Sequence, residues 1–231
     1  MKRRSLLGGI ALAATTGLAV QQANRYHIPR RRPQRSQVAI LRCDRYETVQ
    51  PVIENGLRLL APDLCGKRVL LKPNLVEYAR GAAINTHPML IAAVIEALRR
   101  SGAASVVVAE GPGHIRDMEL LLEESGLQSQ LDAVGKAAFV DLNFDPVARL
   151  PLTTGITNLK ELWLPETLLS ADFVISMPKI KTHHWAGVTL SLKNLFGVVP
   201  GSSTDGPRTS FIGKVSAIPL WNSLRRSRSI S

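Results

Sequence analysis

Lysine, threonine and histidine side chains gather in one short stretch, PKIKTHHWAGVTLSLKNLFG, at residues 178–197. Two lysines alternate around Ile180, so an extended chain places both ammonium groups on one side. Thr189 and Lys193 are four residues apart, which puts them on one face of a helix. Ammonium and hydroxyl groups are the donors that phosphate and carboxylate groups need. The stretch predicts a site for a small anionic ligand, bound by Lys179, Lys181, Thr182, Thr189, Lys193 and Asn194. The alternative is a solvated basic face.

Three further polar residues follow apolar runs. Lys72 and Asn74 flank Pro73 after one run, and we expect both to join the anion site. Glu110 ends another run and precedes Gly-Pro-Gly, which makes it a candidate general base. His183 is the second candidate for proton transfer. Three alternatives stay open: Lys72 as a lysine that reaches water at the sheet edge, Asn74 as the cap of a turn, and Glu110 as the salt-bridge partner of a lysine.

The sequence predicts no metal site and names no cofactor. His114, His183 and Glu110 could hold a divalent metal, but their spacing alone is weak support for such a site. Adjacent His183 and His184 point to opposite sides of an extended chain, so at most one of them can be a ligand. The chain has two cysteines, Cys43 and Cys65, too few to hold an iron–sulfur cluster within it.

The elements that must position these residues follow from the apolar pattern. Short continuous apolar runs, typical of buried strands, alternate with helix-spaced segments. The expected strands are 37–43, 68–71, 105–109, 139–142 and 172–177, and the expected helices are 48–60, 88–100, 117–125, 127–136 and 188–196. Thr86 is the expected N-cap of the second helix. This order predicts an α/β fold with a mostly parallel sheet, covered by helices on both faces. Ligands of such sheets bind beyond the carboxyl ends of the strands, where the candidate residues lie.

The net charge of +11 is unevenly distributed along the chain. Residues 1–35 carry eight basic side chains and residues 207–231 carry five, without any acid in either segment. The middle, 36–206, holds 16 basic and 18 acidic residues and is slightly acidic. Because the excess of positive charge lies in the two tails, we do not expect nucleic acid as a partner.

The first 20 residues are typical of an export signal. A basic start, Lys2-Arg3-Arg4, precedes an uncharged stretch of 16 residues, too short for a membrane span. Arg3-Arg4-Ser5-Leu6-Leu7 matches the twin-arginine pattern. We therefore expect a partner in the twin-arginine export machinery and a protein that is periplasmic or anchored on the outer side of the membrane. Residues 21–36 form a basic, proline-broken linker.

The α/β domain is expected over residues 37–206, and the pattern is lost after it. Ser and Arg make up ten of the 25 residues from 207 to 231, and no strand or amphipathic helix fits them. This segment is either a flexible basic tail or the product of a disrupted reading frame. In the second case the sheet is incomplete at its C-terminal side.

Four segments resemble the family called domain of unknown function 362: VLLKPNLV, SVVVAEGPG, ADFVISMPKIKTH and VTLSLKNLFGVVPG. The resemblance covers residues 37–206 and is most specific in the last two segments. It implies a bacterial or archaeal protein without an established activity. Some members carry a ferredoxin-like cluster domain or a twin-arginine signal, but the four-cysteine motif of that domain is absent from this sequence. Members usually continue well beyond residue 206, which favours the disrupted frame.

Three functional hypotheses remain open, and whether the protein is an enzyme is undecided. The first is an exported enzyme, or an enzyme relic, that acts on a small anion. The second is a non-enzymatic accessory protein that binds a ligand or a redox partner in the same cleft. The third is a truncated product without function.

Overall fold

The computed structural model describes residues 36–113, 116–151, 161–183 and 187–200. Its centre is a parallel sheet of four strands in the order β3-β2-β1-β6. The strands are β1 (Arg68–Pro73), β2 (Ser105–Glu110), β3 (Phe139–Asp141) and β6 (Phe173–Met177). All four lie where continuous apolar runs predicted them, and the α/β fold is confirmed.

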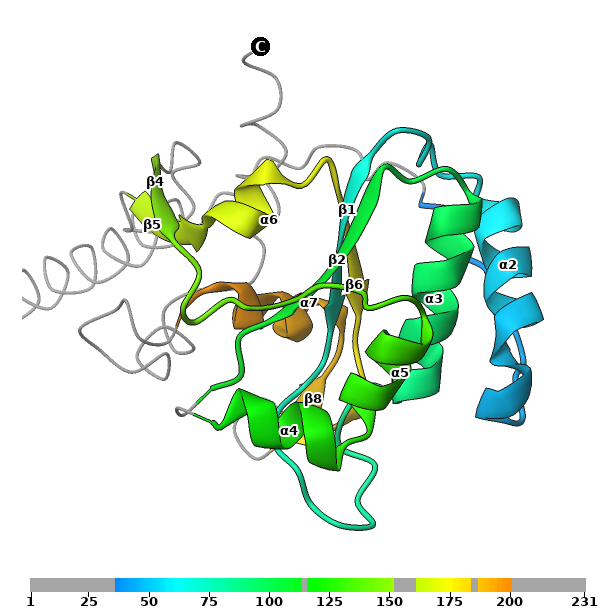
Figure 1. The fold of residues 1–231 in the computed structure, drawn as a ribbon, viewed down its shortest axis with the longest axis horizontal. Helices are drawn as coiled ribbons and strands as arrows, with labels where there is room; N and C mark the ends of the chain where they lie inside the picture. Colours follow the sequence, from blue (N-terminus) through cyan, green and yellow to red (C-terminus); the bar gives the residue numbers. More distant parts are fainter. Residues whose placement is uncertain (1–35, 114–115, 152–160, 184–186, 201–231) are drawn as a thin grey trace, which may run out of the picture.

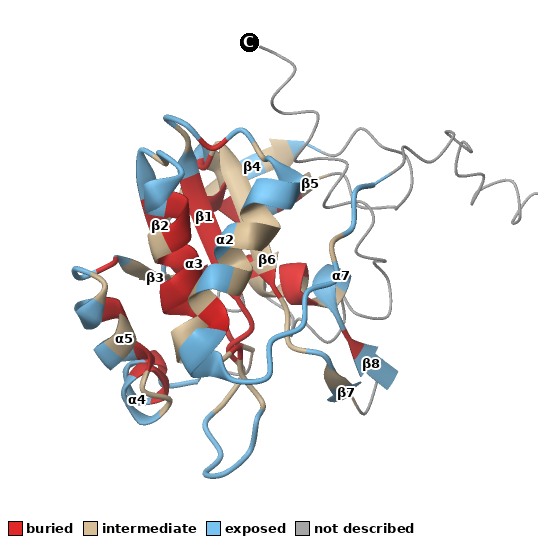
Figure 2. Ribbon diagram, turned by 90° about the vertical axis from the view of Figure 1, so that its right-hand side faces the viewer, coloured by how far each residue is buried: buried red, intermediate tan, exposed pale blue. Residues whose placement is uncertain are grey.

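Helices cover both faces of this sheet (Figure 1). On one face lie α2 (Val49–Leu60), α3 (Pro88–Arg100), α4 (Met118–Glu124) and α5 (Leu127–Ala133). On the other lie α6 (Glu166–Ser170), α7 (Ser191–Asn194) and the antiparallel pair β4 (Val147–Pro151) and β5 (Glu161–Pro165). The buried residues lie in the central strands and the helix surfaces that face them (Figure 2).

Alternation along β1 divides the core into two clusters. Val69 and Leu71 pack with α3, α4 and α5, whereas Leu70 packs with α6, β5 and the segment after α7. Successive side chains of a strand point to opposite faces. Lys72 therefore lies on the same face of the sheet as Leu70, toward α7.

The start of α3 differs from the prediction. His87, not Thr86, is the N-cap, and its Nδ1 accepts a hydrogen bond from the Met89 N–H at 3.3 Å. The Thr86 hydroxyl instead donates to the Met177 carbonyl at 2.7 Å. The His87 ring stacks on Tyr46 with ring centroids 3.8 Å apart. Burial, followed by the positive charge of Lys179, lowers the pKa of His87, so the neutral ring keeps its lone pair for the cap.

Two expected elements are wrong. Residues 37–43 form no strand, and Ile40 is 94% exposed. The helix expected over 188–196 is instead β8 (Gly187–Thr189), the single-turn α7, and a 3-10 turn, η2 (Leu195–Val198). The cause is pairing across the chain, because β8 forms an antiparallel pair with β7 (Lys181–His183).

The β4–β5 pair and α6 were not predicted. In β5, buried Leu162 and Leu164 flank the half-exposed Trp163, which is the alternation of a strand with one covered face. Among the described residues no helix is long and apolar enough to cross a membrane. The expected export signal (1–20), nearly all of the linker and the basic tail (207–231) lie outside the described residues.

Candidate functional site

The candidate residues meet at the carboxyl end of the sheet, as the parallel topology requires. β1 pairs with β2 on one side and with β6 on the other, with Pro73 opposite Met177. The chain leaves all three strands at this edge, and β7, β8 and α7 follow directly after β6. Residues that follow β1, β2 and β6 therefore share one edge.

A buried ion pair lies at the centre of the site. Lys72 Nζ is 2.6 Å from Glu110 Oε1, and the two side chains are 0% and 2% exposed. The same ammonium group donates to the Pro73 carbonyl at 3.2 Å and to Asn194 Oδ1 at 3.4 Å. A buried ion pair is tolerated when further hydrogen bonds satisfy both groups, which is the case here. The positive charge of Lys72 is thus matched inside the protein, and Glu110 is the salt-bridge partner that the sequence left open.

The carboxylate of Glu110 also fixes the two neighbouring loops. Oε1 accepts a hydrogen bond from the Gly111 N–H at 2.9 Å, and Oε2 accepts one from the Leu75 N–H at 3.1 Å. Both oxygens therefore have protein donors. In this arrangement Glu110 is a structural anion that ties the end of β1 to the end of β2.

Asn194 fastens α7 to the sheet. Its Nδ2 donates to the Lys72 carbonyl at 3.1 Å and to Ser176 Oγ at 3.0 Å. One amide group thereby contacts both β1 and β6. A helix of four residues cannot be stable on its own, so such tertiary contacts must hold it.

Gly197 allows the turn after α7 to approach the ion pair. A Cβ atom at this position would overlap Glu110 Oε1 and lie 2.8 Å from Lys72 Nζ. The Leu-Lys-Asn-x-x-Gly pattern now has a structural explanation, with Asn194 as the anchor and Gly197 as the point of contact. The sequence indicated only a helix end at Gly197, because its partners are remote in the chain.

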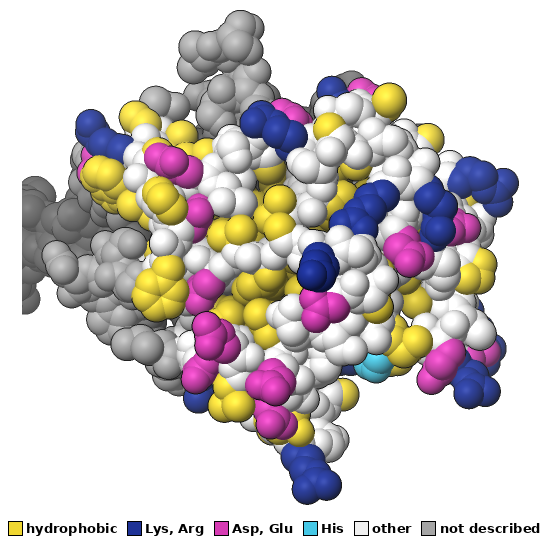
Figure 3. Space-filling view, in the orientation of Figure 1, with side chains coloured by type: hydrophobic (Ala, Val, Ile, Leu, Met, Phe, Trp, Pro, Cys, Tyr) yellow, Lys and Arg dark blue, Asp and Glu magenta, His cyan; other side chains and the backbone are white. Residues whose placement is uncertain are grey.

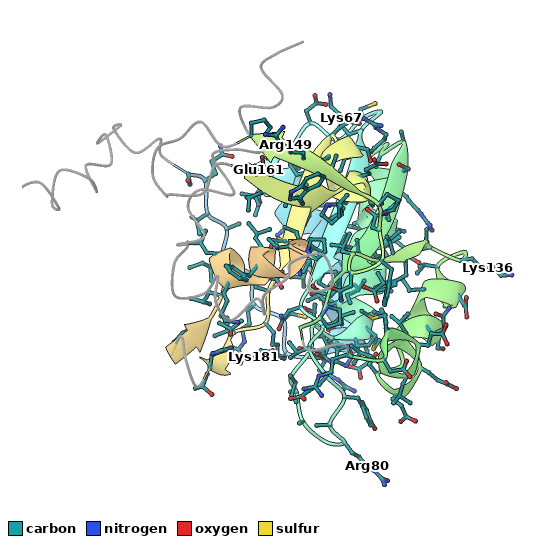
Figure 4. All side chains as sticks on the ribbon, turned by 90° about the vertical axis from the view of Figure 1, so that its left-hand side faces the viewer. Lys67, Arg80, Lys136, Arg149, Glu161 and Lys181 are labelled. Carbon is teal, nitrogen blue, oxygen red and sulfur yellow. The ribbon has the colours of Figure 1, made fainter. Side chains whose placement is uncertain are left out.

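Two half-buried lysines lie beside this network, and no carboxylate of the described residues forms an ion pair with either of them. Lys181 Nζ donates to the Ile84 carbonyl at 2.9 Å. Burial, and then the positive charge of Lys193, lower the pKa of Lys181. These effects outweigh the carboxylates of Glu77 and Glu110, which raise it. Burial also lowers the pKa of Lys193. Figure 4 shows Lys181 beside the gold strands β7 and β8, at the opposite end of the sheet from Lys67.

Two buried polar atoms near these lysines have no hydrogen-bond partner among the described residues: Asn74 Oδ1 and Thr189 Oγ1. Thr189 lies directly opposite Lys181 in the β7–β8 pair. The structure thus brings Lys181, Thr189 and Lys193 together, although Thr189 does so from a strand and not from the expected helix.

The remaining predicted residues lie around this group. Lys179 is close enough to lower the pKa of both His87 and Lys181. His183 is half-buried in β7, two residues after Lys181, and Thr182 between them is exposed. Within the described part of the chain, no three His, Cys, Asp or Glu side chains are grouped so that they could hold a metal ion.

A cavity of about 310 Å³ lies elsewhere, between α2 and α3 near the amino ends of the strands. Its lining includes Arg100, which already pairs with Glu54 at 2.7 Å. Arg58 also lines this cavity and donates to Asn55 Oδ1. Both arginines are exposed to water, whereas Lys181 and Lys193 are half-buried. The lysines are therefore the better candidate for a ligand.

The close contact at Gly197 gives a direct test. We expect Gly197→Ala to lower the free energy of unfolding by about 1–3 kcal/mol, because the added methyl group forces the ion pair and η2 apart. The matched control is Gly113→Ala, since a Cβ there meets nothing within 4 Å. Urea unfolding of both variants measures the difference. Equal stability of the two variants would contradict the close approach.

Comparisons with known proteins agree with this description. The model of a family described as "domain of unknown function (DUF362)" matches residues 69–211. A thylakoid-associated protein of Synechocystis sp. is 32% identical over 139 residues, which cover 59% of this chain and 40% of that protein. The chain thus spans less than half the length of this curated relative, and no solved structure matches it. The family match covers the three strand ends, the lysine segment and the Leu-Lys-Asn-x-x-Gly pattern, and the chain belongs to the DUF362 family.

Proposed function

We propose that this protein binds a small anionic ligand, a phosphate or carboxylate compound, at Lys181 and Lys193. The carrying observation is that these ammonium groups are half-buried, that the positive charge of Lys193 lowers the pKa of Lys181, and that no carboxylate of the described residues lies within 4.0 Å of either. An anion between them would compensate this charge. Lys179 and Thr182 lie on the same segment and would border the ligand.

In this proposal Lys72, Glu110 and Asn194 support the site and do not touch the ligand. The Lys72 ammonium group, both oxygens of the Glu110 carboxylate and the Asn194 amide group each have a hydrogen-bond partner within the protein. His183 is then the candidate for proton transfer if the protein is an enzyme. Binding of the ligand does not depend on that role.

A second candidate function, docking of a redox partner on the same edge, is favoured by one observation. Large apolar side chains are exposed beside the lysines: Ile180 is 75% exposed, Val188 51% and Leu192 54%. Apolar groups next to unpaired charge are typical of interaction surfaces. Nucleic acid is not proposed as a partner, because Lys and Arg alternate with Asp and Glu on the face in Figure 3 and form no continuous basic patch there.

The anion site predicts a specific effect of two substitutions. We expect Lys181→Met and Lys193→Met each to weaken binding of inorganic phosphate about tenfold or more, because each removes a hydrogen bond to a charged group. Lys67→Met removes the same charge at the amino end of the sheet, where the Lys67 side chain is 41% exposed, and should leave binding unchanged. Calorimetric titration of the full chain measures all three. Equal weakening by the control would show only a general charge effect.

The direction of the lysine pKa values also predicts the pH dependence. A bound anion favours the charged lysines and raises their pKa, so binding takes up protons once the pH exceeds the lowered pKa values of the free protein. Affinity should therefore fall as the pH rises, and at a lower pH than for an ordinary lysine. Titrations at alkaline pH in two buffers of different ionisation enthalpy should reveal this proton uptake.

We further propose that residues 1–20 direct export through the twin-arginine machinery, on the basis of Arg3 and Arg4 before an uncharged stretch. A reporter protein fused after residue 36 should appear outside the cytoplasmic membrane. Replacing both Arg3 and Arg4 by Lys should retain it inside, since the pattern requires arginines. A reporter that the lysine variant still exports would indicate a different route.

A further inference from the structure

Two buried oxygen atoms at the site, Asn74 Oδ1 and Thr189 Oγ1, have no hydrogen-bond partner among the described residues. The residues are 7% and 2% exposed. A buried polar atom without a partner destabilises a fold, so each such atom calls for an explanation. A ligand at the neighbouring lysines would supply the missing partners, so this inference rests on the proposed function.

Asn74 lies on the same side as the lysine segment. Its neighbour Leu75 belongs to the core cluster of Val69 and Leu71, on the α3 side of the sheet. Alternation along β1 places the side chain of Lys72 on the opposite face, toward α7, and Asn74 directly follows Pro73, the last residue of that strand. Asn74 therefore lies next to the strand end that carries Lys72.

The backbone around Asn74 is fixed, so its side chain is held in place for a ligand. The Asn74 N–H donates to Thr86 Oγ1 at 2.9 Å, and the Asn74 carbonyl accepts from the Thr86 N–H at 2.9 Å. Two residues before Thr86, the Ile84 carbonyl holds Lys181 Nζ. The same short segment thus connects Asn74 to Lys181, and Thr189 lies opposite Lys181 in the β7–β8 pair.

The polar groups of Lys181, Lys193, Asn74 and Thr189 require different hydrogen-bonding groups on a ligand. The ammonium groups of Lys181 and Lys193 only donate, so they need a negatively charged acceptor. The carboxamide oxygen of Asn74 only accepts, so it needs a donor, and the hydroxyl of Thr189 can do either. A fully deprotonated anion such as sulfate would satisfy the lysines and leave Asn74 Oδ1 without a partner.

We infer that the ligand is an anion that carries its own hydroxyl group, with Asn74 as the residue that selects it. Hydrogen phosphate and a 2-hydroxycarboxylate both have this chemistry. The Asn74 carboxamide accepts the O–H of the ligand, while Lys181, Lys193 and the Thr189 hydroxyl hold the charged oxygens.

Two matched pairs of ligands test this assignment on the full chain at constant ionic strength and about pH 7.5. Phosphate is compared with sulfate, and glycolate with acetate, because each pair differs in the presence of an O–H group. We expect about tenfold tighter binding of the hydroxyl-bearing member of one pair, and the pair that shows it identifies the ligand as a phosphate or a carboxylate.

Asn74→Leu should abolish this preference but leave binding of sulfate or acetate unchanged. Asn55→Leu, at a half-buried asparagine on α2 whose Oδ1 accepts from Arg58, is the matched control and should keep the preference.

The outcomes separate this inference from the proposed function. Equal binding within both pairs, with affinity still lost in Lys181→Met, would overturn the role of Asn74 and retain the anion site. Absence of binding for all four anions would overturn both. Because the comparison within each pair uses the unaltered protein, it stands even if Asn74→Leu fails to fold.

Discussion

The buried pair of Lys72 and Glu110 is the constraint on which the rest of the site depends. Removing both charges from water is costly, and the cost is offset only when the two groups stay together and keep their further hydrogen bonds. Those bonds come from the ends of β1 and β2 and from Asn194. The contact also requires a residue without a side chain at Gly197. One ion pair thereby fixes the positions of two loops, a single-turn helix and the turn that follows it.

Neighbouring residues of α7 have opposite roles in this arrangement. Asn194 is buried against the sheet and joins α7 to the ion pair, whereas Lys193 beside it is half-buried and close to Lys181. Fixing Asn194 therefore also fixes where the ammonium group of Lys193 can reach. The buried pair of Lys72 and Glu110 is electrically neutral, whereas Lys181 and Lys193 beside it carry positive charge. In the proposed function, this neutral pair supports the two lysines that would bind the anion.

The sequence predicted the sheet and the edge that carries the site, because continuous apolar runs and strand ends are local features. It named Lys72, Glu110 and Asn194 as site residues, but it could not assign Lys72 to Glu110, since a contact between two strand ends depends on the strand order. The same limit explains the helix expected over 188–196. Thr189 pairs with Lys181 across a hairpin, and such pairing overrides local preference. The role of Gly197 was not predicted for a similar reason, because the atoms that exclude a Cβ come from residues 72 and 110.

The most direct test of this account is a double-mutant cycle on the ion pair, with Lys72→Met, Glu110→Gln and the combined variant compared by urea unfolding. Each single substitution should lower the free energy of unfolding by about 3–5 kcal/mol, because it leaves one buried charge without its partner. The combined variant should lose less than the sum of the two, by more than about 1 kcal/mol, since it leaves no unpaired charge. Losses that add to within about 0.5 kcal/mol would contradict the account, because they would show that the two groups are not energetically coupled.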